Sequence, residues 1–164
     1  MIDFSTIENY SYRYRLLKFY GRFLHTLFYK KIEVNGLENI PKKGAVIFAP
    51  NHQNALMDAL AVLYTTKGQP VFLARADIFK KQFVAQLLRF IKIMPVYRIQ
   101  DGVDSLKNNE TIFQQCVRIL SSKNTLILLP EGNHSGYWRL RPLKKGLARI
   151  AFQAQKENEY QLPM

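Results

Sequence analysis

The chain has 164 residues, of which 48% are hydrophobic and 22% charged, a composition that is typical of a folded domain and excludes an intrinsically disordered protein. Twenty-four basic and 12 acidic side chains give a formal net charge of +12, so we expect an anionic partner: a nucleic acid, a phospholipid surface or a phosphorylated substrate. The single cysteine, Cys116, excludes an internal disulfide bond and fits a reducing compartment.

Residues 1–31 are rich in aromatic and basic side chains, and their periodicity predicts an amphipathic helix from about residue 14 to residue 29. Two interpretations stay open: a helix that lies in a membrane interface, or one that packs its apolar face on the protein core. The apolar stripe consists of Leu16, Tyr20, Phe23 and Leu27, widened by Leu17, Leu24 and Phe28. The opposite side carries Arg15, Lys18 and Arg22.

A membrane-spanning helix and a cleaved signal peptide are not expected. The least charged stretch, residues 44–66, carries Asp58 and a polar run at residues 50–54, which would be costly in hydrocarbon. The first ten residues contain Asp3 and Glu8 and have no apolar segment of the kind that signal peptides need.

Beyond residue 31, short apolar runs alternate with helical patterns, which predicts an α/β fold: a mostly parallel central sheet with helices on both faces, preceded by the N-terminal amphipathic helix. Strands are expected at 31–35 (half-buried), 45–49, 71–74, 95–97 and 125–129. Helices are expected at 55–66 with Asn54 as cap, 77–91 with Asp77 as cap, 110–121 and 144–156.

Polar residues follow three of the predicted strands directly. His52 and Asp58 come after the strand at 45–49, Arg98 after the strand at 95–97, and Glu131 after the strand at 125–129. Ligands of open α/β sheets bind beyond the carboxyl ends of the strands, so these segments predict the rim of an active site.

His52 and Asp58 are the candidate acid–base pair. Imidazole can take a proton from a hydroxyl group at neutral pH, and a carboxylate beside it fixes its tautomer and stabilises the imidazolium ion. Positions i and i+6 of one regular helix are about 240° apart, so the pair cannot meet inside a helix. We therefore expect His52 in the turn before Asn54 and Asp58 in the second turn of the helix.

Four features of the sequence resemble, in order and spacing across about residues 36–155, three motifs of the glycerolipid acyltransferase family and the Lys-Lys-Gly stretch that follows the third; this family acylates glycerol phosphate and lysophosphatidate. The resemblance is specific because the set is ordered, not because of any single feature. The features are Asn51-His52 with Asp58, Pro95-Val96-Tyr97-Arg98, Leu129-Pro130-Glu131-Gly132, and Pro142-Leu143-Lys144-Lys145-Gly146.

The chain departs from the family pattern at several points. Five residues separate His52 from Asp58 instead of the usual four, which is similar to the fungal-type glycerol-3-phosphate and dihydroxyacetone-phosphate acyltransferases. Lys92 replaces the glycine that opens the second motif, and residues 133–135 read Asn-His-Ser instead of Thr-Arg-Ser. The family's fourth motif does not occur before Met164, so we expect a domain truncated at its C-terminus.

The resemblance implies roles for individual residues. His52 would be the base, with Asp58 as its orienting carboxylate, and Glu131 and Gly132 would help to bind the acceptor. Arg98 offers a planar fork that matches a phosphate, and Lys144 and Lys145 could add to that site. Because a carboxylate repels a phosphate, Glu131 is expected to bind a hydroxyl group or to orient Arg98, while Gly132 allows close backbone approach.

The resemblance also implies the function. The expected enzyme moves a fatty acyl group from acyl-CoA or acyl carrier protein to the hydroxyl of glycerol-3-phosphate, dihydroxyacetone phosphate or 1-acylglycerol-3-phosphate, in phospholipid biosynthesis. It needs no metal and no bound cofactor. We expect a peripheral protein on the cytoplasmic face of the cell membrane, with an amphipathic segment at residues 1–31 and the acyltransferase domain at residues 32–164.

Two other classes of function remain as alternatives. A metallohydrolase could gather His52, Asp58, Glu131 and His134 around a metal, but no close pair of ligands such as His-Glu-x-x-His supports it. A non-catalytic basic module could bind a membrane or a nucleic acid through the net charge alone. The positive charge is spread along the chain with no run of five basic residues, which disfavours nucleic acid.

Overall fold

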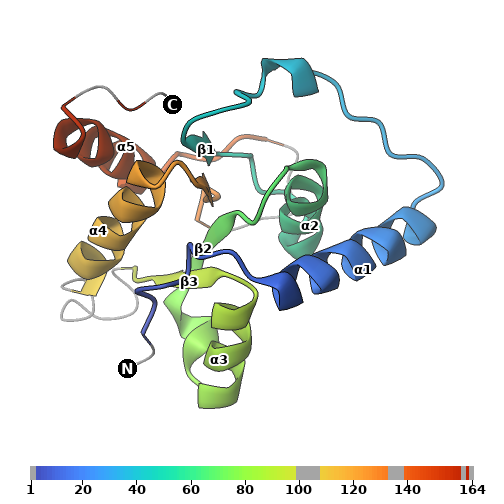
Figure 1. Cartoon of the computed structure of the whole chain (residues 1–164), viewed down its shortest axis with the longest axis horizontal. Helices are drawn as coiled ribbons and strands as arrows, with labels where there is room; N and C mark the ends of the chain where they lie inside the picture. The colour runs from blue at the N-terminus through green and yellow to red at the C-terminus, as the bar shows by residue number, and fades with distance from the viewer. Residues whose placement is uncertain (1–2, 99–107, 133–138, 160–161, 163–164) are drawn as a thin grey trace.

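The computed structural model describes residues 3–98, 108–132, 139–159 and 162. It confirms the α/β class with a parallel sheet of four strands in the order β1-β4-β2-β3 (Figure 1). The strands are β1 (Val46–Phe48), β2 (Val71–Arg75), β3 (Ile93–Val96) and β4 (Thr125–Ile127). Because all of them run the same way, the segments that follow them lie at one edge of the sheet.

The strand register sets which site segments become neighbours. Phe48 of β1 pairs with Ile127 of β4, so these two strands end side by side. On the other half of the sheet, Arg75 of β2 pairs with Val96 of β3. The loop that carries His52 is therefore next to the loop that carries Glu131, and Arg75 is next to the segment that carries Arg98.

The helices cover the sheet in two groups. In Figure 1, α4 and α5 lie together on one side, and α1, α2 and α3 lie on the other. Buried residues of α4 include Ile112, Phe113, Cys116 and Leu120, as the sequence predicts. The helices are α1 (Tyr12–Phe28), α2 (Ala55–Thr65), α3 (Gln82–Phe90), α4 (Asn108–Ser121) and α5 (Gly146–Glu157), with short 3₁₀ turns η1 (Leu37–Asn39) and η2 (Ala76–Phe79).

Three local predictions are wrong. Residues 31–35 form no strand, because no neighbouring strand pairs with them, and Ile32 and Val34 are exposed. The helix predicted at 77–91 is divided into η2 and α3, and Asp77 bonds Arg75 instead of capping a long helix. Asn54 precedes α2, but its side chain makes no capping hydrogen bond.

Helix α1 packs on the domain through its polar and small residues. Tyr14, Lys18, Gly21 and His25 lie along one face; Tyr14 is buried, and the His25 ring lies 5.1 Å from the ring of Tyr64. A Cβ atom added to Gly21 would collide with the Tyr64 hydroxyl, so the side chain of Tyr64 would have to shift to admit a larger residue there. The apolar stripe consequently points away from the domain, which contradicts the alternative that it packs on the core.

Lys18 ties α1 to the turn between α2 and β2. Its Nζ donates hydrogen bonds of 2.9 Å to the backbone oxygens of Thr66 and Gly68. Burial lowers the pKa of Lys18 to about 8, with a smaller contribution from the nearby charge of Arg22. None of the described helices is both long enough and apolar enough to cross a membrane.

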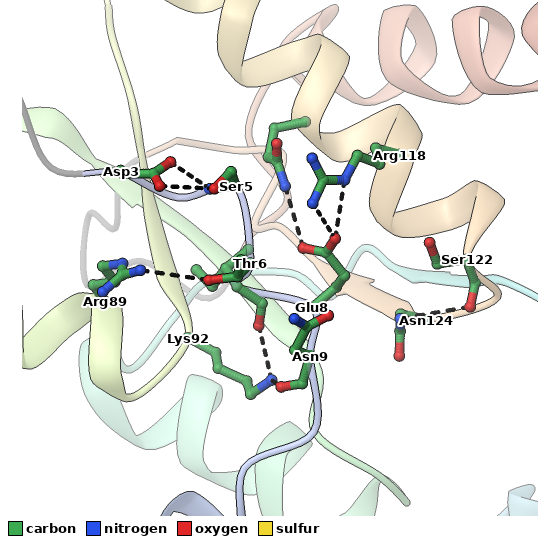
Figure 2. Close-up of polar contacts among 12 residues, drawn as sticks. Asp3, Ser5, Thr6, Glu8, Asn9, Arg89, Lys92, Arg118, Ser122 and Asn124 are labelled. Atoms are coloured by element: carbon green, nitrogen blue, oxygen red, sulfur yellow. Dashed lines mark hydrogen bonds and ion pairs between the residues drawn. The ribbon is translucent and has the colours of Figure 1, made fainter.

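The segment before α1 is fastened to the core rather than free (Figure 2). Ile7 lies within the hydrophobic core, and the Nζ of Lys92 donates to the backbone oxygens of Ile7 at 2.8 Å and Asn9 at 2.6 Å. Glu8 accepts a hydrogen bond of 2.9 Å from Nε of Arg118. We call residues 3–11 the N-terminal strap.

Lys92 has a left-handed backbone, with φ of +61°. That conformation favours glycine, the residue that the family motif usually has at this position. Here a lysine occupies it, and its nearly buried side chain holds the N-terminal strap.

We expect Lys92→Met to lower the free energy of unfolding by about 1–3 kcal/mol, because it leaves the buried backbone oxygen of Ile7 and the partly buried one of Asn9 without their donor. Urea denaturation measures this loss. Lys123→Met is the matched control, since Lys123 also has a left-handed backbone, with φ of +58°, but is exposed. Equal losses in the two variants would show that the ammonium group does not hold the N-terminal strap.

Candidate active site

The structure brings His52 and Asp58 together. His52 lies in the loop after β1, and its Nδ1 is 3.1 Å from Oδ2 of Asp58. The same carboxylate oxygen accepts hydrogen bonds from the backbone N–H groups of Gln53 at 2.8 Å and Asn54 at 2.7 Å. Asp58 therefore shapes the loop and orients the histidine at once.

Asp58 lies in the first turn of α2, one turn earlier than the sequence predicts. The first amides of a helix have no partner within the helix, and a carboxylate near them is favoured by the helix dipole. Asp58 accepts from the amides of Asn54 and of the residue before it, both of which precede α2. These bonds differ from the cap expected of the Asn54 side chain, which would accept from an amide within the first turn. The extra residue of the motif is accommodated in this loop.

The contact between His52 and Asp58 selects the tautomer of the imidazole. A neutral ring that donates Nδ1–H to the carboxylate carries its lone pair on Nε2. Both side chains are mostly shielded from solvent. Nε2 is then the atom that can accept a proton from a bound hydroxyl group.

Glu131 contacts the backbone of His52. The side chain is buried, with 2% of its surface exposed, and Oε1 accepts a hydrogen bond of 2.9 Å from the backbone N–H of His52. Its other oxygen, Oε2, is buried and has no hydrogen-bond partner among the described residues. A buried carboxylate oxygen without a donor is costly, so Oε2 fits a site that is completed by a ligand.

Gly132 and Lys144 lie side by side next to Glu131. Gly132 has a left-handed backbone, with φ of +69°, and a Cβ atom there would be 3.6 Å from Cγ of Lys144. The backbone N–H of Lys144 donates to the oxygen of Pro130 at 2.8 Å. Lys145 is the exposed N-cap residue of α5.

A second group of charged side chains lies after β2 and β3. Nη2 of Arg98 is 3.4 Å from Oδ2 of Asp77, and Nε of Arg75 donates to Oδ1 of the same carboxylate at 3.1 Å. The hydrogen bond from Arg75 holds the pKa of Asp77 below its usual range. Asp77, rather than Glu131, is thus the described carboxylate that pairs with Arg98.

Arg75, Asp77 and Asn109 are residues of this region that were not predicted as part of the site. Arg75 and Asp77 lie at the carboxyl end of β2, so the rule that selected Arg98 could have selected them too. Asn109 of α4 accepts a hydrogen bond from the N–H of Tyr97 at 2.9 Å and donates one to its oxygen at 2.8 Å. This pair of bonds fixes the backbone that precedes Arg98, and no sequence motif indicates it.

The described residues contain no group of three or more potential ligands that is placed to hold a metal ion. His134, which the metallohydrolase alternative requires, lies outside the described residues, as does the rest of the segment 133–138.

The parallel sheet carries a histidine–aspartate pair and two arginines at its carboxyl edge, and this fold and arrangement define the class of the protein. Residues 31–164 match the family model described as Acyltransferase, and the chain belongs to this family.

Several curated proteins are similar to the chain. It is 31% identical over 121 residues to a 1-acyl-sn-glycerol-3-phosphate acyltransferase of Borreliella burgdorferi, an alignment that covers 74% of the chain and 46% of the relative. It is 29% identical over 126 residues to a protein of the same name from Limnanthes alba, covering 75% and 41%. It is 26% identical over 117 residues to glycerol-3-phosphate O-acyltransferase 2 of Saccharomyces cerevisiae, covering 63% and 16%. The chain thus spans less than half the length of these relatives.

We expect Asp58→Ala to lower the fraction of His52 in the neutral Nδ1–H tautomer, because the carboxylate oxygen that accepts from Nδ1 is removed. Asp58→Asn is the matched comparison, since an amide oxygen in the place of Oδ2 can still accept from Nδ1 and from the two backbone N–H groups. Nitrogen-15 NMR of the imidazole resonances reports the tautomer, and His25 serves as the internal reference. An unchanged His52 tautomer in a folded Asp58→Ala variant would contradict the orienting role of Asp58.

Proposed function

We propose that the chain carries the catalytic centre of a glycerolipid acyltransferase. The reaction would transfer a fatty acyl group from the thioester of acyl-CoA or acyl carrier protein to the hydroxyl of a glycerol-phosphate acceptor. The observation that carries the proposal is the 3.1 Å contact between Nδ1 of His52 and Oδ2 of Asp58 at the carboxyl edge of the sheet. The family membership and the names of the curated relatives support it.

In the proposed mechanism His52 acts first as a base and then as an acid. Nε2 takes the proton of the acceptor hydroxyl while that oxygen forms a bond to the thioester carbonyl carbon. The tetrahedral intermediate collapses, the carbon–sulfur bond breaks, and the thiolate receives the proton from Nε2. Asp58 stabilises the imidazolium ion between these two steps. The acceptor supplies the nucleophile, so the mechanism requires no metal and no bound cofactor.

The acceptor would be held by the charged groups on either side of His52. We assign its phosphate to Arg98, with Lys144 and Lys145 as further cations, and a glycerol hydroxyl to Oε2 of Glu131. The burial of Glu131 and the lack of a partner for Oε2 among the described residues support the hydroxyl assignment. Gly132 would allow the acceptor to approach the backbone closely.

The spacing of the first motif guides the choice of acceptor. Five residues between His52 and Asp58 favour the subgroup that acylates glycerol-3-phosphate or dihydroxyacetone phosphate. 1-Acylglycerol-3-phosphate, named in other curated relatives, is the alternative acceptor. An acyl-transfer assay that compares glycerol-3-phosphate, dihydroxyacetone phosphate and 1-acylglycerol-3-phosphate distinguishes these acceptors.

We further propose that the protein works on the surface of a membrane, at its cytoplasmic face. The support is the outward-facing apolar stripe of α1, in which Leu16, Leu27 and Phe28 are largely exposed. Arg15 and Arg22 flank this stripe and are also exposed, which suits a surface with anionic headgroups.

We expect His52→Ala to lower kcat for acyl transfer by about 10²–10⁴-fold, because the general base is lost. The measurement is thiol release from acyl-CoA in the presence of each acceptor. His25→Ala is the control, since His25 lies on α1 and faces Tyr64. Turnover at the wild-type rate in a folded His52→Ala variant would exclude the proposed mechanism.

We expect Arg98→Ala to raise the KM for the phosphorylated acceptor by at least about tenfold, because a charged hydrogen bond is worth about 1.5–3 kcal/mol. The KM for acyl-CoA should change less. Arg149→Ala is the matched control, since Arg149 also pairs with a carboxylate, Glu110, but belongs to α5. If the acceptor KM of Arg98→Ala is as unchanged as that of Arg149→Ala, the acceptor phosphate binds at another place than Arg98.

A further inference from the structure

Helix α3 directs a large part of its apolar surface away from the protein. Phe83, Leu87 and Phe90, which share one face at helical spacing, are all exposed, and Phe83 is 77% exposed. Ala85, on the opposite side, is buried. A helix that only covers a sheet would show the reverse arrangement, with its large apolar residues inside.

The charges on and beside α3 fit an anionic surface. Neither α3 nor α1 contains an acidic residue. Lys80 and Lys81 immediately precede α3 and are exposed, and Arg13, Arg15 and Arg22 are exposed on α1. Apolar side chains flanked by cations, without acids between them, match a lipid surface that carries negative headgroups.

Residues beside α1 and α3 link the two helices indirectly. In Figure 1 both helices lie on the side of the sheet that is opposite to α4 and α5. Lys92 follows α3 by two residues, and its Nζ lies 6.0 Å from the ring centre of Tyr14 in the first turn of α1. Arg89 of α3 also donates a hydrogen bond of 3.5 Å to the hydroxyl of Thr6 in the N-terminal strap.

We propose that α3 is a second lipid-contacting element, which inserts Phe83, Leu87 and Phe90 into an anionic membrane surface alongside α1. This inference rests on the membrane association proposed above and names a further element for it. Ile78 in η2 is exposed as well and extends the apolar surface of α3 toward the site.

The position of α3 in the chain connects this surface to the chemistry. Asp77, which pairs with Arg75 and Arg98, lies in η2, only a few residues before α3 begins. A membrane in contact with α3 would therefore lie near the arginines to which we assign the acceptor phosphate. An acceptor that resides in the membrane could reach them without fully leaving the interface.

The test is binding of the protein to vesicles of phosphatidylcholine alone and of an equal mixture of phosphatidylcholine and phosphatidylglycerol, measured by flotation. Phe83→Ser should weaken binding to the mixed vesicles by about tenfold, because the variant lacks the phenyl group whose transfer from water into the lipid favours the bound state. Phe152→Ser is the matched control: Phe152 is 73% exposed on α5 and should bind as the wild type does. Phe23→Ser reports separately on α1.

Three results would overturn the proposal. One is wild-type binding by Phe83→Ser, and another is an equal loss in Phe83→Ser and Phe152→Ser. The third is a wild-type dimer in gel filtration that Phe83→Ser dissociates, which would assign the surface to a second copy of the chain.

His52→Ala separates this inference from the proposed function. It should keep wild-type vesicle binding while losing acyl transfer. Phe83→Ser should in turn retain acyl transfer from a short-chain acyl-CoA to glycerol-3-phosphate in the absence of vesicles. If His52→Ala stays active, the mechanism fails but the vesicle experiment still decides the role of α3.

Discussion

One carboxylate oxygen organises the candidate active site. Oδ2 of Asp58 accepts hydrogen bonds from two backbone amides and lies 3.1 Å from the ring of His52. The amides hold the loop in a shape that lets the ring meet a residue six positions later, whereas a continuous helix would keep the two apart. The buried Glu131 then supports the same loop from β4 through the backbone N–H of His52. Removing Asp58 would thus alter both the shape of the loop and the tautomer of His52.

The parallel sheet explains why two separate groups of charged residues lie at one edge. His52 and Glu131 follow the neighbouring strands β1 and β4, while Arg75 and Arg98 lie at or after the ends of β2 and β3. In the mechanism proposed above, the first group serves proton transfer and hydroxyl binding, and the second binds an anion. Because β4 pairs with β2, the segments that carry the two groups start from adjacent strands of one sheet.

Much of the fold was predictable because buried strands and amphipathic helices leave strong periodic patterns. The strands β1, β2 and β4 and the buried face of α4 follow such patterns closely. The prediction of a strand at 31–35 is wrong because alternating apolar residues show only that a strand there could have one apolar face. They do not show that another strand lies beside it to pair with. The division between η2 and α3 was missed because the apolar residues around it continue at helical spacing, whereas Asp77 is engaged by Arg75.

The motif residues of the site were predictable, but the contacts that position them were less so. The sequence indicates His52, Asp58 and Arg98 through their places after strands. It does not indicate that Asn109 fixes Tyr97 by two hydrogen bonds, because these depend on how α4 packs against the end of β3. The inward face of α1 was also unpredictable, because Lys18 is accommodated there by two backbone oxygens of a distant turn.

The N-terminal strap is held at a defined distance from Arg98. Lys92, which binds the strap, immediately precedes β3, and Arg98 follows the end of the same strand. At roughly 3.3 Å per residue, the six steps between them span at most about 20 Å, because only residues 93–96 are in strand conformation. The distance between the N-terminal strap and Arg98 is therefore fixed mainly by one short strand of the sheet, and not by a flexible linker.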